Sequence, residues 1–397
     1  MRRLFLFTFF SLSLAAQYNF EKLDQRMRQF VSDGELVGFQ TLIIKEGKII
    51  HSDLYGHDNL EEGKLLQQNS IFRIASITKC IVAVAIMKLY EKGYFDLEDP
   101  IGRYIPEYRN PMVYQADETL KPASNPIRVI DVLRHTTGIG KTYPALRKQF
   151  DILKSNRSFD LETEVKRMSK IPLAAEPGTL WIYGPSVSIG AYLIEKLTGQ
   201  KIDAFLKKEI FDPLKMQDTF FEIPKEKQHR FTSGYFLEKP GYHSLIDHPL
   251  SSPYTHNVTF CNPAGGLAST MQDFSIFCRM LLNKGTYEGN TILEPKTVAL
   301  MTSDQLRLIK NAKPSNDNHK PNDAIGFGFT FNVIKNIEAY PFPGSQGSYG
   351  WFGSWGPYFR IDPKQGIIMI LMTQMKGWHY SRREIFENHV YNAILDL

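Results

Sequence analysis

The stretch Ile71-Phe-Arg-Ile-Ala-Ser-Ile-Thr-Lys79 leads directly into a run of residues with helical periodicity. The pattern predicts a helix from Thr78 to Lys92, and Gly93 follows where helices commonly end. Apolar residues recur at helical spacing in this run, at Ile81, Val82, Ala85, Ile86 and Leu89. We therefore expect a largely buried helix that begins two residues after Ser76.

Ser76 and Lys79 form the only Ser-x-x-Lys motif in the chain. Residues three apart project from one face of a helix, so the Lys79 amine can reach the Ser76 hydroxyl. An amine on an otherwise apolar helix is partly desolvated, which favours its neutral, basic form. The other interpretation is structural: Ser76 caps the helix and Lys79 extends to the surface. This segment alone does not decide between the two.

Sequence patterns outside this segment predict strands near both ends of the chain and helices between them. We expect helices at Phe20–Val31, Val187–Leu197, Ile202–Glu209, Met271–Asn283 and Ser381–Leu395, and a surface loop at Lys310–Asp323. We expect strands on both sides of a Glu46-Gly47 turn, and at Gly326–Val333, Tyr358–Ile361 and Gly366–Thr373. The predicted architecture is therefore an α/β fold with one sheet closed by the two ends and a helical insert at roughly 95–260.

The composition is that of a folded globular protein. Of the 397 residues, 43% are hydrophobic and 22% charged, which excludes a disordered or fibrous chain. The formal net charge of +5 is too small to indicate nucleic-acid binding.

The first residues have the pattern of a secretory leader. Arg2-Arg3 precede an apolar run from Leu4 to Leu14, and Ser13-Leu14-Ala15 is a small-x-small cleavage signal. An uncleaved anchor is the alternative, but the run is shorter than the ~20 residues that span a membrane. We expect cleavage near Ala15 or Ala16, a mature chain from residue 17 without stable membrane insertion, and a secreted or periplasmic location.

Three cysteines, Cys80, Cys261 and Cys278, argue against a disulfide framework in an exported protein. Cys80 lies on the apolar helix and is expected to be buried, whereas pairing of Cys261 with Cys278 stays open. The cysteine and histidine spacings do not suggest a metal site, and we expect no cofactor.

Together with these motifs, several further segments resemble the serine β-lactamase-related family. That family includes class C β-lactamases, D-alanyl-D-alanine peptidases and a branch of carboxylesterases. The similarity starts at 71–79 and continues through Gly93–Pro100, Leu133–Gly138, Glu176–Gly178, Trp181–Gly184, Ala264–Thr270 and Phe359–Pro363. It implies a β-lactamase-like fold for residues 17–397, with Ser76 as nucleophile and Lys79 as its base.

The resemblance also assigns a role to Tyr183. In the family, the tyrosine of the second motif works with the lysine as general base and later protonates the leaving group. On its residues alone, Tyr183 in a Gly-Pro loop serves equally well as a packed aromatic. Many members have Asn two residues later, contacting the acyl amide; here Pro185 stands there and has no donor to offer. The esterase branch also tends to lose this Asn.

The third family motif, Lys-(Thr/Ser)-Gly, corresponds to Trp351-Phe352-Gly353. In β-lactamases and peptidases its cation and hydroxyl hold the substrate carboxylate, and both are replaced here. The resemblance implies that the N–H groups of Ser76 and Ser354 form the oxyanion hole. We expect Trp351 and Phe352 to offer apolar surface to the substrate, with Trp351 facing the cleft; an aromatic hairpin packed on the core is the alternative.

His135 stands in a segment that is structural in the family, and no Gly-x-Ser-x-Gly motif supports a Ser-His-Asp triad. The leading hypothesis is an exported serine hydrolase that cleaves small neutral carboxylic esters. A D-alanyl-D-alanine carboxypeptidase or β-lactamase is the nearest alternative. A catalytically silent relative that binds peptidoglycan or a partner is an alternative of another class.

Overall fold

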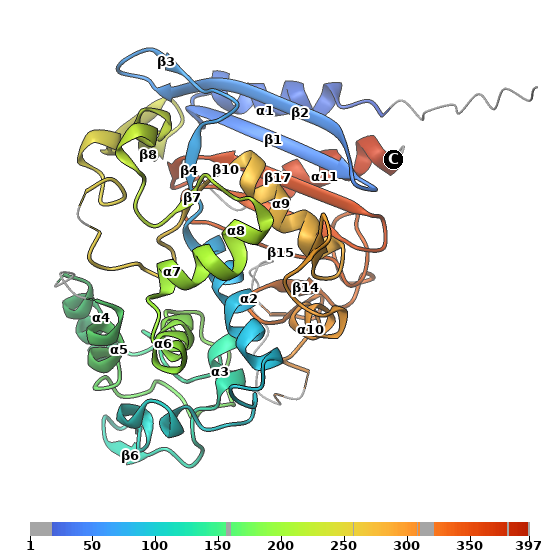
Figure 1. Ribbon diagram of the computed structural model, residues 1–397. Helices are drawn as coiled ribbons and strands as arrows, with labels where there is room; N and C mark the ends of the chain where they lie inside the picture. Colours follow the sequence, from blue (N-terminus) through green and yellow to red (C-terminus); the bar gives the residue numbers. More distant parts are fainter. Residues whose placement is uncertain are drawn as a thin grey trace, which may run out of the picture.

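An eight-stranded antiparallel sheet lies at the centre of the described part of the chain (Figure 1). The computed structural model describes residues 18–155, 160–256, 258–307, 309, 321–378 and 381–395. The predicted leader, residues 1–16, and most of the predicted loop at 310–323 lie outside these residues. The strand order is β13-β14-β15-β16-β17-β1-β2-β3. Their bounds are β1 Gly38–Lys45, β2 Lys48–Asn59, β3 Lys64–Leu65, β13 Ile325–Phe327, β14 Asn332–Ile334, β15 Tyr349–Phe352, β16 Tyr358–Asp362 and β17 Ile367–Thr373.

The two ends of the chain meet in this sheet, as the sequence predicts, because Phe39–Lys45 of β1 pairs with the whole of β17. Side chains of β17 point alternately to two separate cores. One core receives Ile368, Ile370 and Met372, and the other receives Ile367, Met369 and Leu371. Helices α1 (Glu21–Ser32) and α11 (Ser381–Leu395) cover the second core, whereas α2 (Thr78–Glu91) and α9 (Met271–Leu282) cover the first.

The segment predicted as a helical insert contains helices gathered beside α2 and away from the sheet (Figure 1). These are α3 (Val129–Leu133), α4 (Pro144–Ser155), α5 (Leu161–Met168), α6 (Val187–Thr198), α7 (Ile202–Leu206) and α8 (Asp212–Leu214). The segment also contains the hairpins β5–β6 (Met112–Tyr114, Leu120–Pro122) and β8–β9 (Gly234–Lys239, Tyr242–Asp247). A small sheet of β4 (Ile71–Arg73), β10 (Ala268–Thr270) and β7 (Thr219–Phe220) joins it to the start of α2.

Most predicted elements match the structure within one or two residues. Helices α1, α2, α6, α9 and α11 lie where the periodicity places them, and the Glu46-Gly47 turn has φ values of 50° and 77°. Helix α7 ends earlier than predicted because the chain continues as a wider π-type turn from Lys207 to Phe211.

The predicted strand Gly326–Val333 is wrong, because the structure divides it into β13 and β14. Between them the Gly328 N–H donates to the Phe331 carbonyl at 2.8 Å, and Thr330 adopts a φ of 70°. A Cβ at Gly328 would come within 2.1 Å of the Met301 carbonyl oxygen, so the turn requires glycine there. The continuous apolar pattern concealed this turn.

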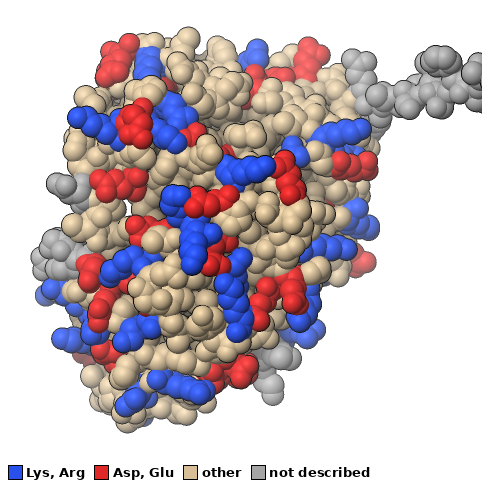
Figure 2. Space-filling model, in the orientation of Figure 1, with Lys and Arg blue, Asp and Glu red and all other residues tan. Residues whose placement is uncertain are grey.

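Helix α2 is buried along almost its whole length, as predicted. All three cysteines are free, so the pairing of Cys261 with Cys278 that the sequence left open does not form. In the described residues, no helix is both long and apolar enough to cross a membrane. Figure 2 shows basic and acidic side chains interspersed on one face of the molecule.

Candidate active site

Ser76 lies in a short 3₁₀ turn, Ala75–Ile77, between β4 and α2. It is the only residue from Ile71 to Lys79 that is not buried. Ala75, directly before it, has a φ of 45°, a strained value for a residue with a side chain. Hydrogen bonds on both sides of the turn keep Ala75 in this conformation. Before it, Ile74 N–H donates to the Leu267 carbonyl at 3.0 Å, and after it, Leu267 N–H donates to Thr78 Oγ1 at 3.1 Å.

Lys79 faces Ser76 from the first turn of α2. Its side chain is buried, with the residue 3% exposed, and Nζ donates to Ser76 Oγ at 3.2 Å and to the Ala264 carbonyl at 2.5 Å. The structural interpretation of this motif therefore fails: Lys79 does not reach the surface, and no side chain caps the start of α2. The arrangement lets an amine exchange a proton with the Ser76 hydroxyl.

Tyr183 lies over the same amine, in the loop before α6. Lys79 Nζ is 4.7 Å from the centre of its ring. The loop is fixed on the Leu133–Gly138 segment, since Ile182 N–H donates to the His135 carbonyl at 2.9 Å. The Tyr183 hydroxyl accepts a hydrogen bond from Trp351 Nε1 at 3.0 Å. Tyr183 is thus held from both sides next to the Ser76–Lys79 pair.

The third motif meets the nucleophile through its backbone. Gly353, after β15, lies against Ile74; a Cβ there would be 2.6 Å from the Ile74 carbonyl oxygen. This contact requires glycine and brings the Ser354 amide close to the Ser76 turn. Among the described residues, no acceptor binds the N–H of Ser76 or of Ser354. Two unpaired N–H groups at this place suit an oxyanion.

The expectation that Trp351 faces the cleft is wrong, whereas Phe352 is partly exposed. Trp351 is only 2% exposed and belongs to the core, because its strand position points it at Tyr183 and Phe327. Phe352 stacks on Trp351 with ring centres 4.7 Å apart, and the Arg383 guanidinium covers it at 4.8 Å. Trp351 contacts the site through its indole N–H, which donates to the Tyr183 hydroxyl. The sequence pattern does not predict this contact.

A cavity of about 360 Å³ opens beside Lys79 and Tyr183. Pro185 lines it, together with Lys141, Asn262 and Ala264. Lys141 forms an ion pair with Asp151. Sequence reasoning did not identify Asn262 and Ala264 as site residues, because the Ala264–Thr270 segment was noted only as a match. The Ala264 carbonyl that binds Lys79 is a backbone group, which the residue type does not predict.

His135 lies behind Tyr183 with ring centres 4.7 Å apart, and its Nδ1 contacts Ser186 Oγ at 2.8 Å. The residue is fully buried with a φ of 60°. Burial, and secondarily the charge of Lys79, holds the pKa of His135 well below its usual range. His135 is therefore neutral and supports the tyrosine loop, in agreement with the structural role expected for this segment.

The site occupies a fold that known proteins share. A family model described as Beta-lactamase matches residues 23–390. The chain belongs to the beta-lactamase family. Esterase EstB of Burkholderia gladioli is 27% identical over 389 residues, with 92% of each chain covered. The N-acetylmuramyl-L-alanine amidase of Bacillus subtilis is 25% identical over 388 residues, covering 91% of this chain and 82% of the relative.

A solved structure described as "EstCE1, a hydrolase with promiscuous acyltransferase activity" superposes with a TM-score of 0.79. It is 20% identical, and the match covers 94% of this chain and 97% of that chain. The β-lactamase-like fold predicted from the sequence is therefore confirmed. As a member of this family, the protein is a serine hydrolase.

The buried His135 makes the stability of the fold depend on pH. Its folded-state pKa lies well below 6.5, the value for an exposed histidine, so below that pH only the unfolded chain gains the proton. The contribution of neutral His135 to the free energy of unfolding is fully present above about pH 6.5. Below that pH it falls by about 1.4 kcal/mol per pH unit. Replacement by Asn, which tolerates positive φ, removes that slope.

The expected result for His135→Asn is a free energy of unfolding that falls less steeply than that of the wild type from pH 6.5 to 5, measured by urea denaturation. His229→Asn, which replaces an exposed histidine, is the control. Parallel curves for wild type and His135→Asn would contradict a neutral, buried His135.

Proposed function

We propose that the protein hydrolyses small neutral carboxylic esters through an acyl-enzyme on Ser76. The observation that carries this proposal is the hydrogen bond from Lys79 Nζ to Ser76 Oγ beneath Tyr183, whose hydroxyl is held by the neutral N–H of Trp351. The leader pattern at residues 1–16 supports action outside the cytoplasm. The esterase named among its relatives supports the ester class, at low identity.

In the proposed mechanism Ser76 Oγ attacks the ester carbonyl, and the hydroxyl proton passes to Lys79 and Tyr183. The N–H groups of Ser76 and Ser354 stabilise the negative charge on the carbonyl oxygen. Tyr183 then protonates the leaving alcohol as its bond to the acyl carbon breaks. Water attacks the acyl-enzyme in the same way, gives its proton to the same pair, and releases the acid and free Ser76.

The site offers little to a substrate carboxylate. Of the lysines that line the catalytic cavity, Lys141 is paired with Asp151, and Lys79 is bound to Ser76 and Ala264. The buried carboxyl-bearing residue Glu164 also lines the cavity. A carboxylate entering it would lose its hydration without gaining an unshared cation, which is costly. This charge pattern supports a neutral ester over a β-lactam or a D-alanyl peptide.

Ser76→Ala should abolish ester hydrolysis and labelling by a fluorophosphonate probe, because the acyl-accepting oxygen is gone. Lys79→Ala should lower kcat by ~10³-fold or more, since residues that act as one catalytic unit lose most activity when either is removed. Ser303→Ala, on the surface, is the control. Circular dichroism checks the fold, and ester turnover retained in purified Ser76→Ala protein would refute the mechanism.

Trp351→Phe keeps an aromatic ring but removes the donor to Tyr183. A neutral hydrogen bond contributes about 0.5–1.5 kcal/mol, so kcat should fall ~2–13-fold with little change in KM. Trp355→Phe, on the neighbouring turn, should leave both unchanged. Identical kinetics for the two variants would show that the Trp351 N–H is irrelevant to Tyr183.

The charge of the substrate separates the esterase from its nearest alternative. The side-chain cation and hydroxyl of the third motif are absent, and two charge-assisted hydrogen bonds contribute roughly 1.5–3 kcal/mol each. We therefore expect kcat/KM for the best p-nitrophenyl ester to exceed that for nitrocefin by roughly a few thousand-fold. D-alanyl-D-alanine release should be negligible. Nitrocefin hydrolysed more efficiently than every neutral ester would favour the β-lactamase or peptidase alternative.

A further inference from the structure

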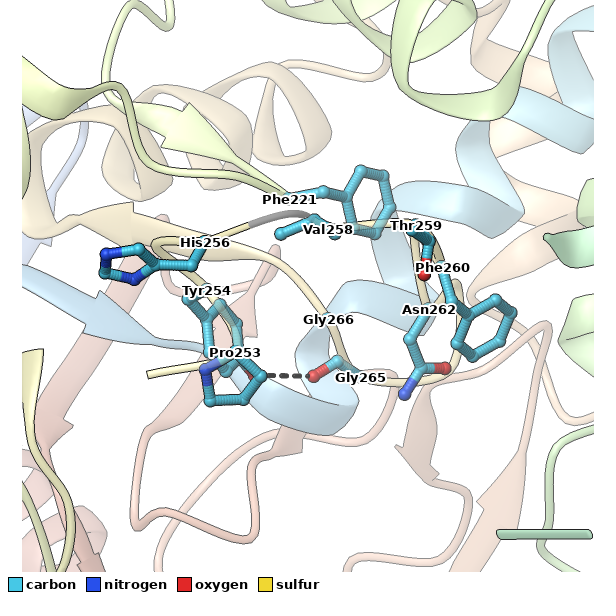
Figure 3. A pocket seen from close by; sticks show the side chains of 10 residues that line it. All are labelled: Phe221, Pro253, Tyr254, His256, Val258, Thr259, Phe260, Asn262, Gly265 and Gly266. Carbon is cyan, nitrogen blue, oxygen red and sulfur yellow. Dashed lines mark hydrogen bonds between the residues drawn. The ribbon is translucent and has the colours of Figure 1, made fainter. Parts of the chain in front are cut away.

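A second cavity, of about 220 Å³, shares the lining residue Asn262 with the catalytic one. Its lining is largely apolar and aromatic, with Phe221, Tyr254, Val258 and Phe260 around it. Figure 3 shows Phe221 and Phe260 on one side and Pro253 and Tyr254 on the other. Tyr254 is fixed there, because its hydroxyl donates to the Gly265 carbonyl at 3.1 Å.

The second cavity reaches the nucleophile through Gly265. A Cβ built on Gly265 would lie 3.5 Å from the carbonyl carbon of Ala75, the residue before Ser76. Because Gly265 has no side chain, nothing from this position separates the Ser76 turn from the cavity. The second cavity is therefore one residue away from Ser76, through the contact of its lining residue Gly265 with Ala75.

Asn262 lines both cavities. Its Oδ1 accepts the Ala264 N–H at 3.0 Å, and its carbonyl oxygen accepts the N–H groups of Gly265 and Gly266 at 3.2 and 2.8 Å. The Ala264 contact identifies the oxygen end of the amide, so Nδ2 is the end that is left to donate to a ligand. The turn packs closely around Asn262, since a Cβ on Gly266 would lie 2.9 Å from the Asn262 carbonyl oxygen.

We propose that the second cavity is the subsite for the acyl group of the substrate, and that Asn262 Nδ2 donates a hydrogen bond to an acceptor atom on that group. This inference rests on the proposed function. Tyr183, which protonates the leaving alcohol, lines the catalytic cavity and not the second one. The alcohol therefore leaves on the Tyr183 side, and the acyl group extends past Gly265 to the other side.

The size and chemistry of the cavity define the acyl class. An apolar cavity on the order of 150 Å³ holds a benzene ring, so about 220 Å³ accepts a phenyl group or a chain of roughly five or six carbons. His256 is the only titratable side chain besides Tyr254 among its described lining residues, and Figure 3 shows it at the end away from Asn262. A neutral acyl group with an ether or carbonyl oxygen near its ester carbonyl fits best.

Two ester series test the subsite. One varies the acyl group of p-nitrophenyl esters from acetate to hexanoate and phenylacetate, and the other varies the alcohol of a fixed acid. Val258→Trp, which fills the cavity, should lower the hexanoate-to-acetate ratio of kcat/KM at least 10-fold and leave the alcohol series in its original order. Thr259→Phe is a second, independent filling variant. Leu250→Trp, at a side chain that is 72% exposed, is the control.

Asn262→Asp removes the donor and keeps the oxygen that accepts Ala264 N–H. Wild type should prefer p-nitrophenyl methoxyacetate over the isosteric butanoate by roughly 2–13-fold after correction for spontaneous hydrolysis, as one hydrogen bond implies. Asn262→Asp should lose this preference. A preference that persists in Asn262→Asp would overturn the role of Asn262.

Labelling of Ser76 makes the subsite test independent of ester turnover. Alkyl fluorophosphonates form a Ser76 Oγ–phosphorus bond as fluoride leaves and the hydroxyl proton passes to Lys79. The ratio of labelling rates for hexyl and methyl groups on phosphorus should fall in Val258→Trp. Absence of ester turnover in a labelled wild type would refute the proposed function alone. Filling variants that change neither ratio, or that change only the alcohol series, would overturn the acyl subsite.

Discussion

The burial of the Lys79 amine is the constraint on which the rest of the site depends. A polar or charged group removed from water is stable only when its hydrogen bonds are replaced. Here Ser76 Oγ and the Ala264 carbonyl replace them, and the Tyr183 ring covers the amine. Three segments far apart in the sequence must therefore pack together around one nitrogen. Burial of this amine therefore brings Ser76, Ala264 and Tyr183 to one place.

Backbone geometry also positions the groups around Ser76. The strained φ of Ala75 turns Ser76 out of an otherwise buried segment, and the hydrogen bonds of Leu267 hold the chain on both sides of it. Gly353 closes the other side, because only glycine fits against the Ile74 carbonyl. The N–H of Ser354 is thus placed by steric exclusion. Its own side chain is exposed and takes no part in this placement.

Local patterns predicted the parts of the structure that depend on local chemistry. The spacing of Ser76 and Lys79 on a periodic helix predicts their contact, and the apolar runs predict α2, β17 and the closure of the sheet. Contacts that depend on which way a strand faces were not predictable. Trp351 and Phe352 both read as apolar surface, yet one donates to Tyr183 and the other stacks between Trp351 and Arg383. The glycine turn inside 326–333 and the roles of Ala264 and Asn262 rest on backbone atoms, which carry no residue signature.

The replacement at Trp351 and the pattern of charges support the same substrate chemistry. An indole N–H can hold the Tyr183 hydroxyl as a cationic side chain could, but it adds no charge to the site. The lysines that line the catalytic cavity are occupied, Lys141 by Asp151 and Lys79 by Ser76 and Ala264. In the proposed function, binding comes from apolar contact and from neutral donors such as the Asn262 amide, which lines both cavities. These contacts support the proposal that the substrate carries no carboxylate, because a carboxylate would lose its hydration without compensation.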